Sequence, residues 1–219
     1  MAADDALLRC AQEVGVPRLI VRVYGWDRPC ASIGYFQKIE IARQIVSSLD
    51  RSCFIVRRPT GGGFVDHATD WTYSMIYPEN FFAPRRQDYH FVHSIIRKVL
   101  IENGGYRTLE EVTPERACRG KITRCFAEPS AFDLMSCGLK IAGAAQRRVK
   151  GWILHQGSVA LSAEGSDNTL LEFAMAFVRS LGEQLENQIS TRELETHEAL
   201  RASNLFHHQY TSRRWNEKF

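Results

Sequence analysis

Residues 57–74 combine two arginines, a run of three glycines and the start of an alternating strand pattern. Gly61, Gly62 and Gly63 have no Cβ atoms, so a ligand can approach this backbone closely, whereas their entropic cost gives a plain surface loop little reason to contain them. Arg57 and Arg58 supply donors that suit a carboxylate or a phosphate. The glycine spacing fits neither the dinucleotide motif nor the P-loop. The stretch therefore predicts a binding loop, and a tight turn before a core strand is the alternative.

Cys125 is the candidate nucleophile. Lys121 and Arg124 precede it closely, and Lys140 lies fifteen positions after it. A cation close in space lowers the pKa of a thiol and so raises its thiolate fraction. Pro129 favours an irregular, accessible segment around the thiol. From these residues alone, a structural cysteine is the commoner interpretation.

Lys140 begins a segment in which small residues occupy positions 142–145. Small side chains would let a ligand approach the strand, and strict alternation would place Lys140 on one face with Ala142 and Ala144. A solvated strand lysine is the alternative. His155 in the next predicted strand could add a polar group beside Lys140, although a lone histidine is more often a structural group.

His67 and Asp70 follow the glycine run and could form a Cys-His-Asp arrangement with Cys125. The sequence does not show that the three side chains converge. A hydrogen bond from loop amides to Asp70 is the commoner use of an aspartate in such a place.

Hydrophobic periodicity predicts the elements that must position these residues. Helices are expected at residues 3–14, 39–49, 88–102, 170–185 and 193–205. Strands are expected at residues 19–24, 31–36, 53–56 and 71–77, followed by an antiparallel meander at 132–135, 139–145 and 152–161. The meander should turn at Cys137 and Gly138 and again around residues 149–151. Residues 108–121 are polar and without periodicity, which predicts a surface loop.

Composition narrows the class of protein. The chain has 219 residues, of which 44% are hydrophobic and 24% charged, which indicates one globular domain. A net charge of +3 suits an acidic protein partner or an anionic ligand, and the absence of a basic stripe argues against nucleic-acid binding. Six cysteines without a Cys-x-x-Cys pair predict no metal site, and no signal pattern or long apolar run is present. We therefore expect a cytoplasmic protein without a membrane segment.

Taken together, the segments resemble the lipoate-protein ligase and octanoyltransferase family, which is related to the biotin-protein ligases. The resemblance rests on residues 1–8 (MAADDALL), 22–26 (RVYGW), 32–37 (SIGYFQ), 57–62 (RRPTGG), 140–146 (KIAGAAQ) and 215–216 (WN). It implies an α+β fold of the biotin/lipoate protein ligase catalytic-domain type, a mixed and mostly antiparallel sheet flanked by helices. Residues 1–219 would form a single catalytic domain without a C-terminal accessory domain, and a monomer.

Within that family, the chain is most similar to octanoyltransferases of Gram-positive bacteria, which carry a Cys-Phe-x-x-Pro-Ser-x-x-x-Leu segment. Residues 125–134 (CFAEPSAFDL) match it. The resemblance implies that Cys125 is the acylated nucleophile and that Lys140 contacts the activated acyl group. The implied acyl or ligand-binding residues are Arg58, Gly61, Gly62, Gly63, His67, Tyr73, Gly143, Ala144, His155 and Gly157.

The implied activity is transfer of an octanoyl or lipoyl group from acyl carrier protein to a lysine of a lipoyl domain. The acceptor would be a lipoyl domain of a 2-oxoacid dehydrogenase or the glycine cleavage H protein, and no cofactor would be needed. One alternative is an ATP-dependent lipoate-protein ligase that works through lipoyl-AMP and requires ATP and Mg²⁺. Another is a non-catalytic binder of lipoyl or acyl-carrier domains.

Three features depart from the family pattern where contact with the donor is expected. Gly63 stands where these octanoyltransferases have an arginine, and Ala144 replaces a usual serine. His155, Gln156 and Gly157 reverse a common Gln-His-Gly order.

Overall fold

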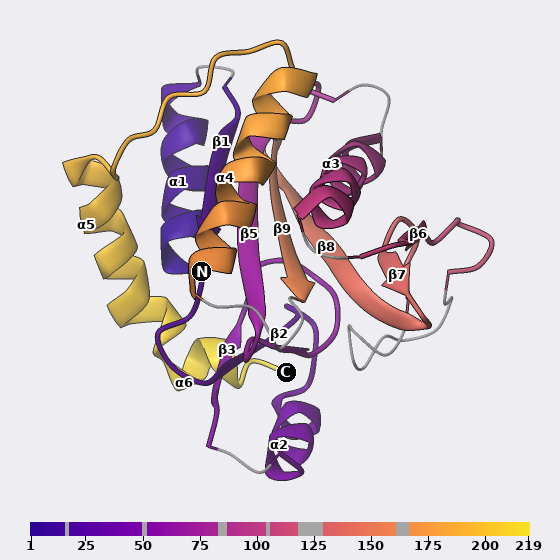
Figure 1. Ribbon diagram of the computed structural model, residues 1–219. Helices are drawn as coiled ribbons and strands as arrows, with labels where there is room; N and C mark the ends of the chain where they lie inside the picture. Colours follow the sequence, from indigo (N-terminus) through magenta and orange to yellow (C-terminus); the bar gives the residue numbers. More distant parts are fainter. Residues whose placement is uncertain (16–17, 50–51, 83–86, 104–105, 118–128, 161–166) are drawn as a thin grey trace.

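The computed structural model describes residues 1–219 apart from 16–17, 50–51, 83–86, 104–105, 118–128 and 161–166 (Figure 1). In chain order its elements are α1 (Ala2–Val14), β1 (Ile20–Tyr24), β2 (Cys30–Ile33), α2 (Ile39–Ser47), β3 (Phe54–Arg57), β4 (Val65–Asp66), β5 (Asp70–Pro78), α3 (Gln87–Asn103), β6 (Glu110–Glu111), β7 (Leu134–Ser136), β8 (Leu139–Val149), β9 (Trp152–Ala160), α4 (Asp167–Gln184), α5 (Thr196–Leu205), the π-helical turn η1 (Phe206–Tyr210) and α6 (Arg213–Asn216).

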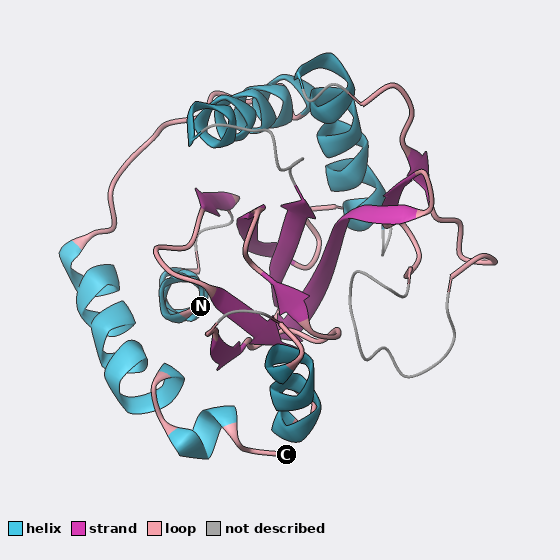
Figure 2. Ribbon diagram, turned by 60° about the horizontal axis from the view of Figure 1, so that its bottom comes forward, coloured by secondary structure: helices cyan, strands magenta, loops and turns pink. Residues whose placement is uncertain are grey.

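The described strands form two sheets. The larger sheet has the order β1-β5-β9-β8-β7-β6 and is antiparallel throughout. The smaller sheet has the order β3-β2-β4, and its β2–β3 pair is parallel. Figure 2 shows the strands in the middle of the molecule with helices around them. The predicted α+β fold with a mostly antiparallel sheet flanked by helices is confirmed.

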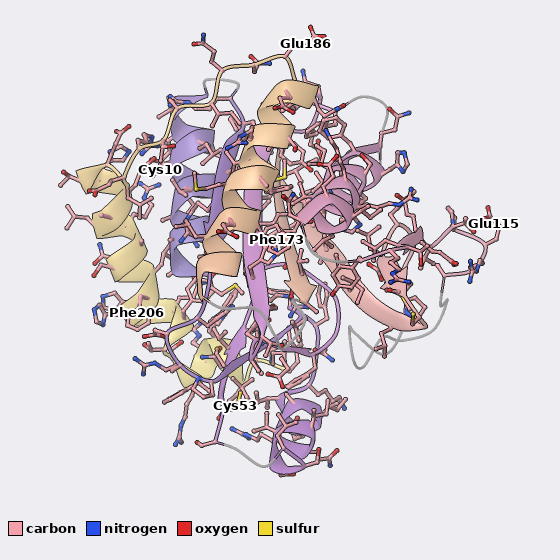
Figure 3. The ribbon with its side chains drawn as sticks, viewed as in Figure 1. Cys10, Cys53, Glu115, Phe173, Glu186 and Phe206 are labelled. Carbon is pink, nitrogen blue, oxygen red and sulfur yellow. The ribbon has the colours of Figure 1, made fainter. Side chains whose placement is uncertain are left out.

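One face of the large sheet packs against α3 and α4. Trp71, Tyr73 and Met75 alternate along β5 onto this face and join Ile96 of α3 and Phe177 of α4 in the main core. Phe173, which Figure 3 labels on α4, belongs to the same cluster and is 3% exposed. The even positions of β5 are buried as well, because the opposite face is also covered.

The opposite face packs against α1, and α5 lies outside α1 (Figure 1). Leu7 and Leu8 of α1 contact Ile76 and Leu154 of the sheet. Cys10 is buried on α1, where Figure 3 shows it between α1 and α5. Burial raises the pKa of the Cys10 thiol, which is the behaviour of a packed structural cysteine.

The turns of the meander follow the residue types. Cys137 and Gly138 have φ of 49° and 79°, and Lys150 and Gly151 have 50° and 76°. Two consecutive positive φ values are typical of the type I′ turn, whose twist matches a two-residue hairpin. The predicted meander and its turns are confirmed.

Two predicted segments were wrong in extent. The strand expected at 31–36 ends at Ile33, because the chain turns at Gly34 to pass the glycine run. Glu110 and Glu111, expected in a loop, form the short strand β6 against β7. Within the part of the chain that the structure describes, no helix has both the length and the apolar character needed to cross a membrane.

Candidate functional site

A small, largely apolar cavity lies between β8 and β9 of the large sheet, the small sheet and the start of α1. Its water-accessible volume is about 30 Å³. Six of the residues predicted for the site line it: Arg58, His67, Lys140, Gly143, Ala144 and Gly157. Its other lining residues are Met1, Ser32, Val65, Thr72, Ala145, Gln156 and Ser158.

Arg58 lines the cavity and fixes the glycine run, although Gly61, Gly62 and Gly63 are not themselves among the lining residues. Its Nη2 donates to the carbonyl oxygens of Gly61 and Gly63, at 2.8 Å each, and its Nη1 donates to Ser32 Oγ at 2.8 Å. Gly62 has φ of 90°, a conformation that favours glycine, whereas the side of Gly61 on which a Cβ would lie is open space. The turn itself therefore explains Gly62, and Gly61 leaves room beside the loop.

Arg57, considered a ligand donor from the sequence, has a structural role instead. Its guanidinium is fully buried and donates to the carbonyls of Gly34, Tyr35 and Gln37 at 2.6–3.1 Å. It also donates to the carbonyl oxygens of Trp215 and Asn216. Buried charges need such partners, so Arg57 ties α6 to the turn after β2.

A buried hydrogen-bonded chain connects Ser32, His67 and Asp70. Ser32 Oγ lies 2.7 Å from His67 Nε2, and His67 Nδ1 lies 2.7 Å from Asp70 Oδ2. The Asp70 carboxylate can only accept at this contact, which places the imidazole proton on Nδ1 and leaves Nε2 to accept from Ser32. Trp26 stacks on the imidazole with a centroid separation of 4.2 Å. Asp70 thus orients His67 and also accepts from Ser158, rather than bonding loop amides.

Lys140 forms a buried ion pair with Asp133. Lys140 Nζ lies 2.7 Å from Asp133 Oδ2, and the two side chains are 3% and 2% exposed. The backbone amide of Ser130 also donates to Asp133, at 2.6 Å. Burial raises the pKa of Asp133, while Lys140 and the amide of Ser130 lower it. The pair places one cation against the wall of the cavity, where Asp133 holds its position.

The expected alternation of Lys140 with Ala142 and Ala144 was wrong. A bulge in the β7–β8 pairing makes Leu134 oppose Ala142 while the next residue, Met135, opposes Lys140. One extra residue in β8 reverses the alternation, and both Ile141 and Ala142 join the main core. Lys140 instead lies over Gly143, where a Cβ would collide with Lys140 Cε and approach Nζ to 2.6 Å.

His155 and Tyr73 lie on the α3/α4 face of the sheet and do not reach the cavity. His155 Nδ1 accepts from Gln146 Nε2 at 3.0 Å, and its Nε2 lies 3.3 Å from the Tyr73 hydroxyl. Burial lowers the pKa of His155 to about 3, so the imidazole is neutral. A Cβ at Gly157 would collide with the ring of Tyr73, which explains this glycine by packing.

Gln156, which was named only for the reversed residue order and not as a ligand-binding residue, faces the cavity in place of the predicted histidine. Its Oε1 accepts from Thr60 at 2.8 Å and its Nε2 donates to Asp4 Oδ2 at 2.7 Å. The reversed order of residues 155 and 156 therefore changes which side chain the strand presents to the cavity. The sequence signal for Gln156 was the alternation along β9: Gly157 packs against Tyr73 on one face of the sheet, so the neighbouring Gln156 points to the other face. Asp133 and Ser32 had no local signal, since their partners lie elsewhere in the chain.

Cys125 lies outside the described residues, so the structure gives no contact for it. Among the residues that are described, no group of three His, Cys, Asp or Glu side chains could hold a metal ion.

Curated relatives share about a third of their residues with this chain. The octanoyltransferase LipM of Geobacillus kaustophilus is 37% identical over 174 residues, which cover 75% of this chain and 61% of that protein. The LipM proteins of Staphylococcus aureus and Bacillus subtilis are 38% and 33% identical, and the matches cover 73% and 75% of this chain and 60% and 61% of the relatives. The chain thus spans about 60% of the length of these relatives.

Solved structures share the fold. A putative lipoate protein ligase from T. acidophilum superposes with a TM-score of 0.75 at 23% identity, covering 100% of this chain and 92% of that one. A lipoate-protein ligase A bound with ATP gives a TM-score of 0.73 at 21% identity, with 99% and 92% coverage. The profile of the lipoyl protein ligase A/B catalytic domain matches residues 1–197. This chain belongs to the lipoyl protein ligase A/B catalytic domain family.

Proposed function

We propose that this chain transfers an octanoyl or lipoyl group to a lysine of a lipoyl domain through a thioester on Cys125. The observation that carries the proposal is the group of relatives, 33–38% identical, whose name is octanoyltransferase LipM. The natural acceptors on this proposal are lipoyl domains of 2-oxoacid dehydrogenases or the glycine cleavage H protein. The donor is an acyl carrier protein thioester.

The chemistry divides one transfer into two displacements at the same carbonyl. The Cys125 thiolate attacks the donor thioester, a new carbon–sulfur bond forms, and the carrier thiolate leaves. The neutral amine of the acceptor lysine then attacks the acyl-cysteine, loses a proton and releases the Cys125 thiolate. Each displacement passes through an oxyanion, and Lys140 at the cavity wall supplies positive charge for it.

The cavity has room for one or two water molecules. An octanoyl chain therefore requires its walls to separate. The side of Gly61 is open, and Met1 and Val65 contribute flexible or apolar surface. We expect the acyl chain to enter between the glycine run and the segment of β8 and β9 around Gly143 and Gly157.

The decisive experiment measures the intact mass of the protein after incubation with octanoyl-carrier protein. The proposal expects one octanoyl adduct, which disappears when an apo lipoyl domain is added and the domain gains the same mass. Cys125→Ser should lose both the adduct and the transfer. Cys137→Ser is the matched control, because Cys137 is an exposed cysteine on the β7–β8 turn, and it should retain both.

The result that contradicts the proposal is modification of the lipoyl domain only from free lipoate or octanoate with ATP and Mg²⁺, with pyrophosphate release and full activity of Cys125→Ser. That outcome would identify an ATP-dependent ligase. Tight binding of either partner with turnover from neither donor would identify a binding protein.

A further inference from the structure

A second, larger hollow lies outside the acyl cavity, between α1, α5 and the end of the β8–β9 hairpin. Its volume is about 950 Å³. Figure 1 shows α1 and α5 side by side, and the two helices contact each other. We call this hollow the α1–α5 cleft. Its lining residues are Asp5, Leu8, Arg9, Gln12, Glu13, Arg147, Val149, Lys150, His197, Leu200, Arg201, Asn204, Leu205 and His208.

The cleft carries an excess of positive charge. Four arginines or lysines and two carboxylates line it, and each carboxylate already forms an ion pair with one of the arginines. Arg9 pairs with Asp5 at 3.1 Å, and Arg201 pairs with Glu13 at 2.7 Å.

Arg147 and Lys150 are the surplus cations. Within the described part of the chain, neither has an ion pair or a side-chain hydrogen bond. Two cations without countercharge in a hollow favour an anionic partner, because the surrounding protein focuses their field.

The cleft also offers some exposed apolar surface. Leu200 on the α5 wall is 61% exposed and Val149 is half-buried, whereas Leu8 and Leu205 are already buried by the fold. An exposed leucine beside basic side chains fits a helix that presents an apolar stripe flanked by acidic side chains. A small anion would use the basic side chains and leave Leu200 uncovered.

The cleft lies at a distance from the acyl cavity that suits the donor of the proposed reaction. Both hollows include residues of β8: Ala145 lines the cavity, and Arg147, two positions later, lines the cleft. Arg147 and Val149 therefore lie about 7 and about 14 Å from Ala145 along the strand. The long, flexible pantetheine arm of a carrier protein can span this distance, so we assign the cleft to the donor.

We propose that the α1–α5 cleft is the docking site for an acidic helix of the carrier protein that brings the acyl thioester. This inference rests on the proposed function for the identity of the partner. Arg147 and Lys150 bind its carboxylates, and Leu200 covers its apolar stripe.

The test compares Arg147→Gln/Lys150→Asn with the matched control Arg97→Gln/Lys98→Gln. Asparagine tolerates the positive φ of position 150. Arg97 and Lys98 are exposed on α3, across the sheet from the cleft, so both variants lose the same charge. Binding of fluorescently labelled octanoyl-carrier protein is measured by anisotropy. Steady-state transfer is measured with this donor and with octanoyl-N-acetylcysteamine, a small thioester without a protein.

Exposed ion pairs contribute about 0.2–1 kcal/mol each, so loss of two should weaken carrier binding roughly 2- to 30-fold. Added salt should weaken wild-type binding more than binding by the variant. Transfer from the small thioester should stay within about twofold of wild type, and the control variant should bind the carrier normally. These results together support the proposal.

Unchanged carrier binding in the cleft variant would overturn it, as would equal weakening in the control. Weaker binding of the lipoyl domain with normal carrier binding would assign the cleft to the acceptor and also overturn it. Equal loss of transfer with both donors would mean that the substitution acts on the catalytic site, and this result would also overturn the proposal. The anisotropy measurement does not need turnover, so failure of the proposed acyl transfer is distinguishable from failure of docking.

Discussion

Removal of one partner from the buried Lys140–Asp133 pair should destabilise the protein strongly. The two side chains are at most 3% exposed and their charged atoms lie 2.7 Å apart. Loss of one partner from such a pair typically costs about 3–5 kcal/mol, because the other charge stays buried without compensation. We therefore expect Lys140→Met and Asp133→Asn each to lower the free energy of unfolding by about 3 kcal/mol or more. Asparagine keeps an oxygen for the amide of Ser130.

The double variant Asp133→Asn/Lys140→Met removes both charges while keeping the volumes. It should be more stable than either single variant, with a coupling energy of about 2 kcal/mol or more. Urea unfolding of the four proteins at pH 7.5, followed by circular dichroism, gives this number. Acyl transfer should remain lost in the double variant, because Lys140 is absent. Additivity of the single effects within about 0.5 kcal/mol would refute an ionic interaction between these residues.

Two further outcomes follow from buried side chains. His93 and His155 have pKa values lowered by burial to about 4 and about 3, whereas the unfolded chain binds these protons near pH 6.5. The free energy of unfolding should therefore keep its full value above pH 6.5 and be lower by about 4 kcal/mol at pH 5, through the two histidines together. His93→Gln should halve this dependence of the unfolding free energy on pH, measured by urea unfolding. An unchanged pH dependence would contradict the burial of a neutral His93. Gly157→Ala should lower the free energy of unfolding by about 1–3 kcal/mol, because the new Cβ collides with Tyr73. Gly61→Ala places its Cβ in open space and should change this free energy by no more than about 0.5 kcal/mol. Equal thermal stabilities of the two variants would contradict the packing argument.

The sheet was predictable from the sequence because its strands bury side chains with a period of two. The alternation in residues 71–77 predicted β5, and the glycines at positions 138 and 151 marked both turns of the meander. The resemblance to the lipoate-protein ligases then placed the glycine run and Lys140 in one site. Lys140 lines the cavity, whereas the glycine run does not and is tied to it only through Arg58.

Arg57 and Lys140 show why the roles and orientations of some side chains at the site were not predictable from the sequence. Five carbonyls surround Arg57, and two of them come from residues about 160 positions away, so no local pattern separates it from Arg58. The bulge beside Lys140 adds one residue to β8 without changing the hydrophobic character of the segment. A pattern with a period of two cannot locate such an insertion, and it therefore assigned Lys140 to the wrong face.

Strand β8 then explains how one short segment can serve both the acyl chemistry and the carrier docking that we propose. The bulge turns Lys140 toward the cavity, and Gly143 leaves space for its side chain. Beyond the bulge, the regular alternation carries Ala145 to the cavity and Arg147 to the α1–α5 cleft. The distance between acyl chemistry and carrier docking is thus set by a rigid strand paired with β9, so a variant that weakens docking at Arg147 need not move Lys140. This rigidity is the reason that transfer from a small thioester should survive the loss of the cleft charges.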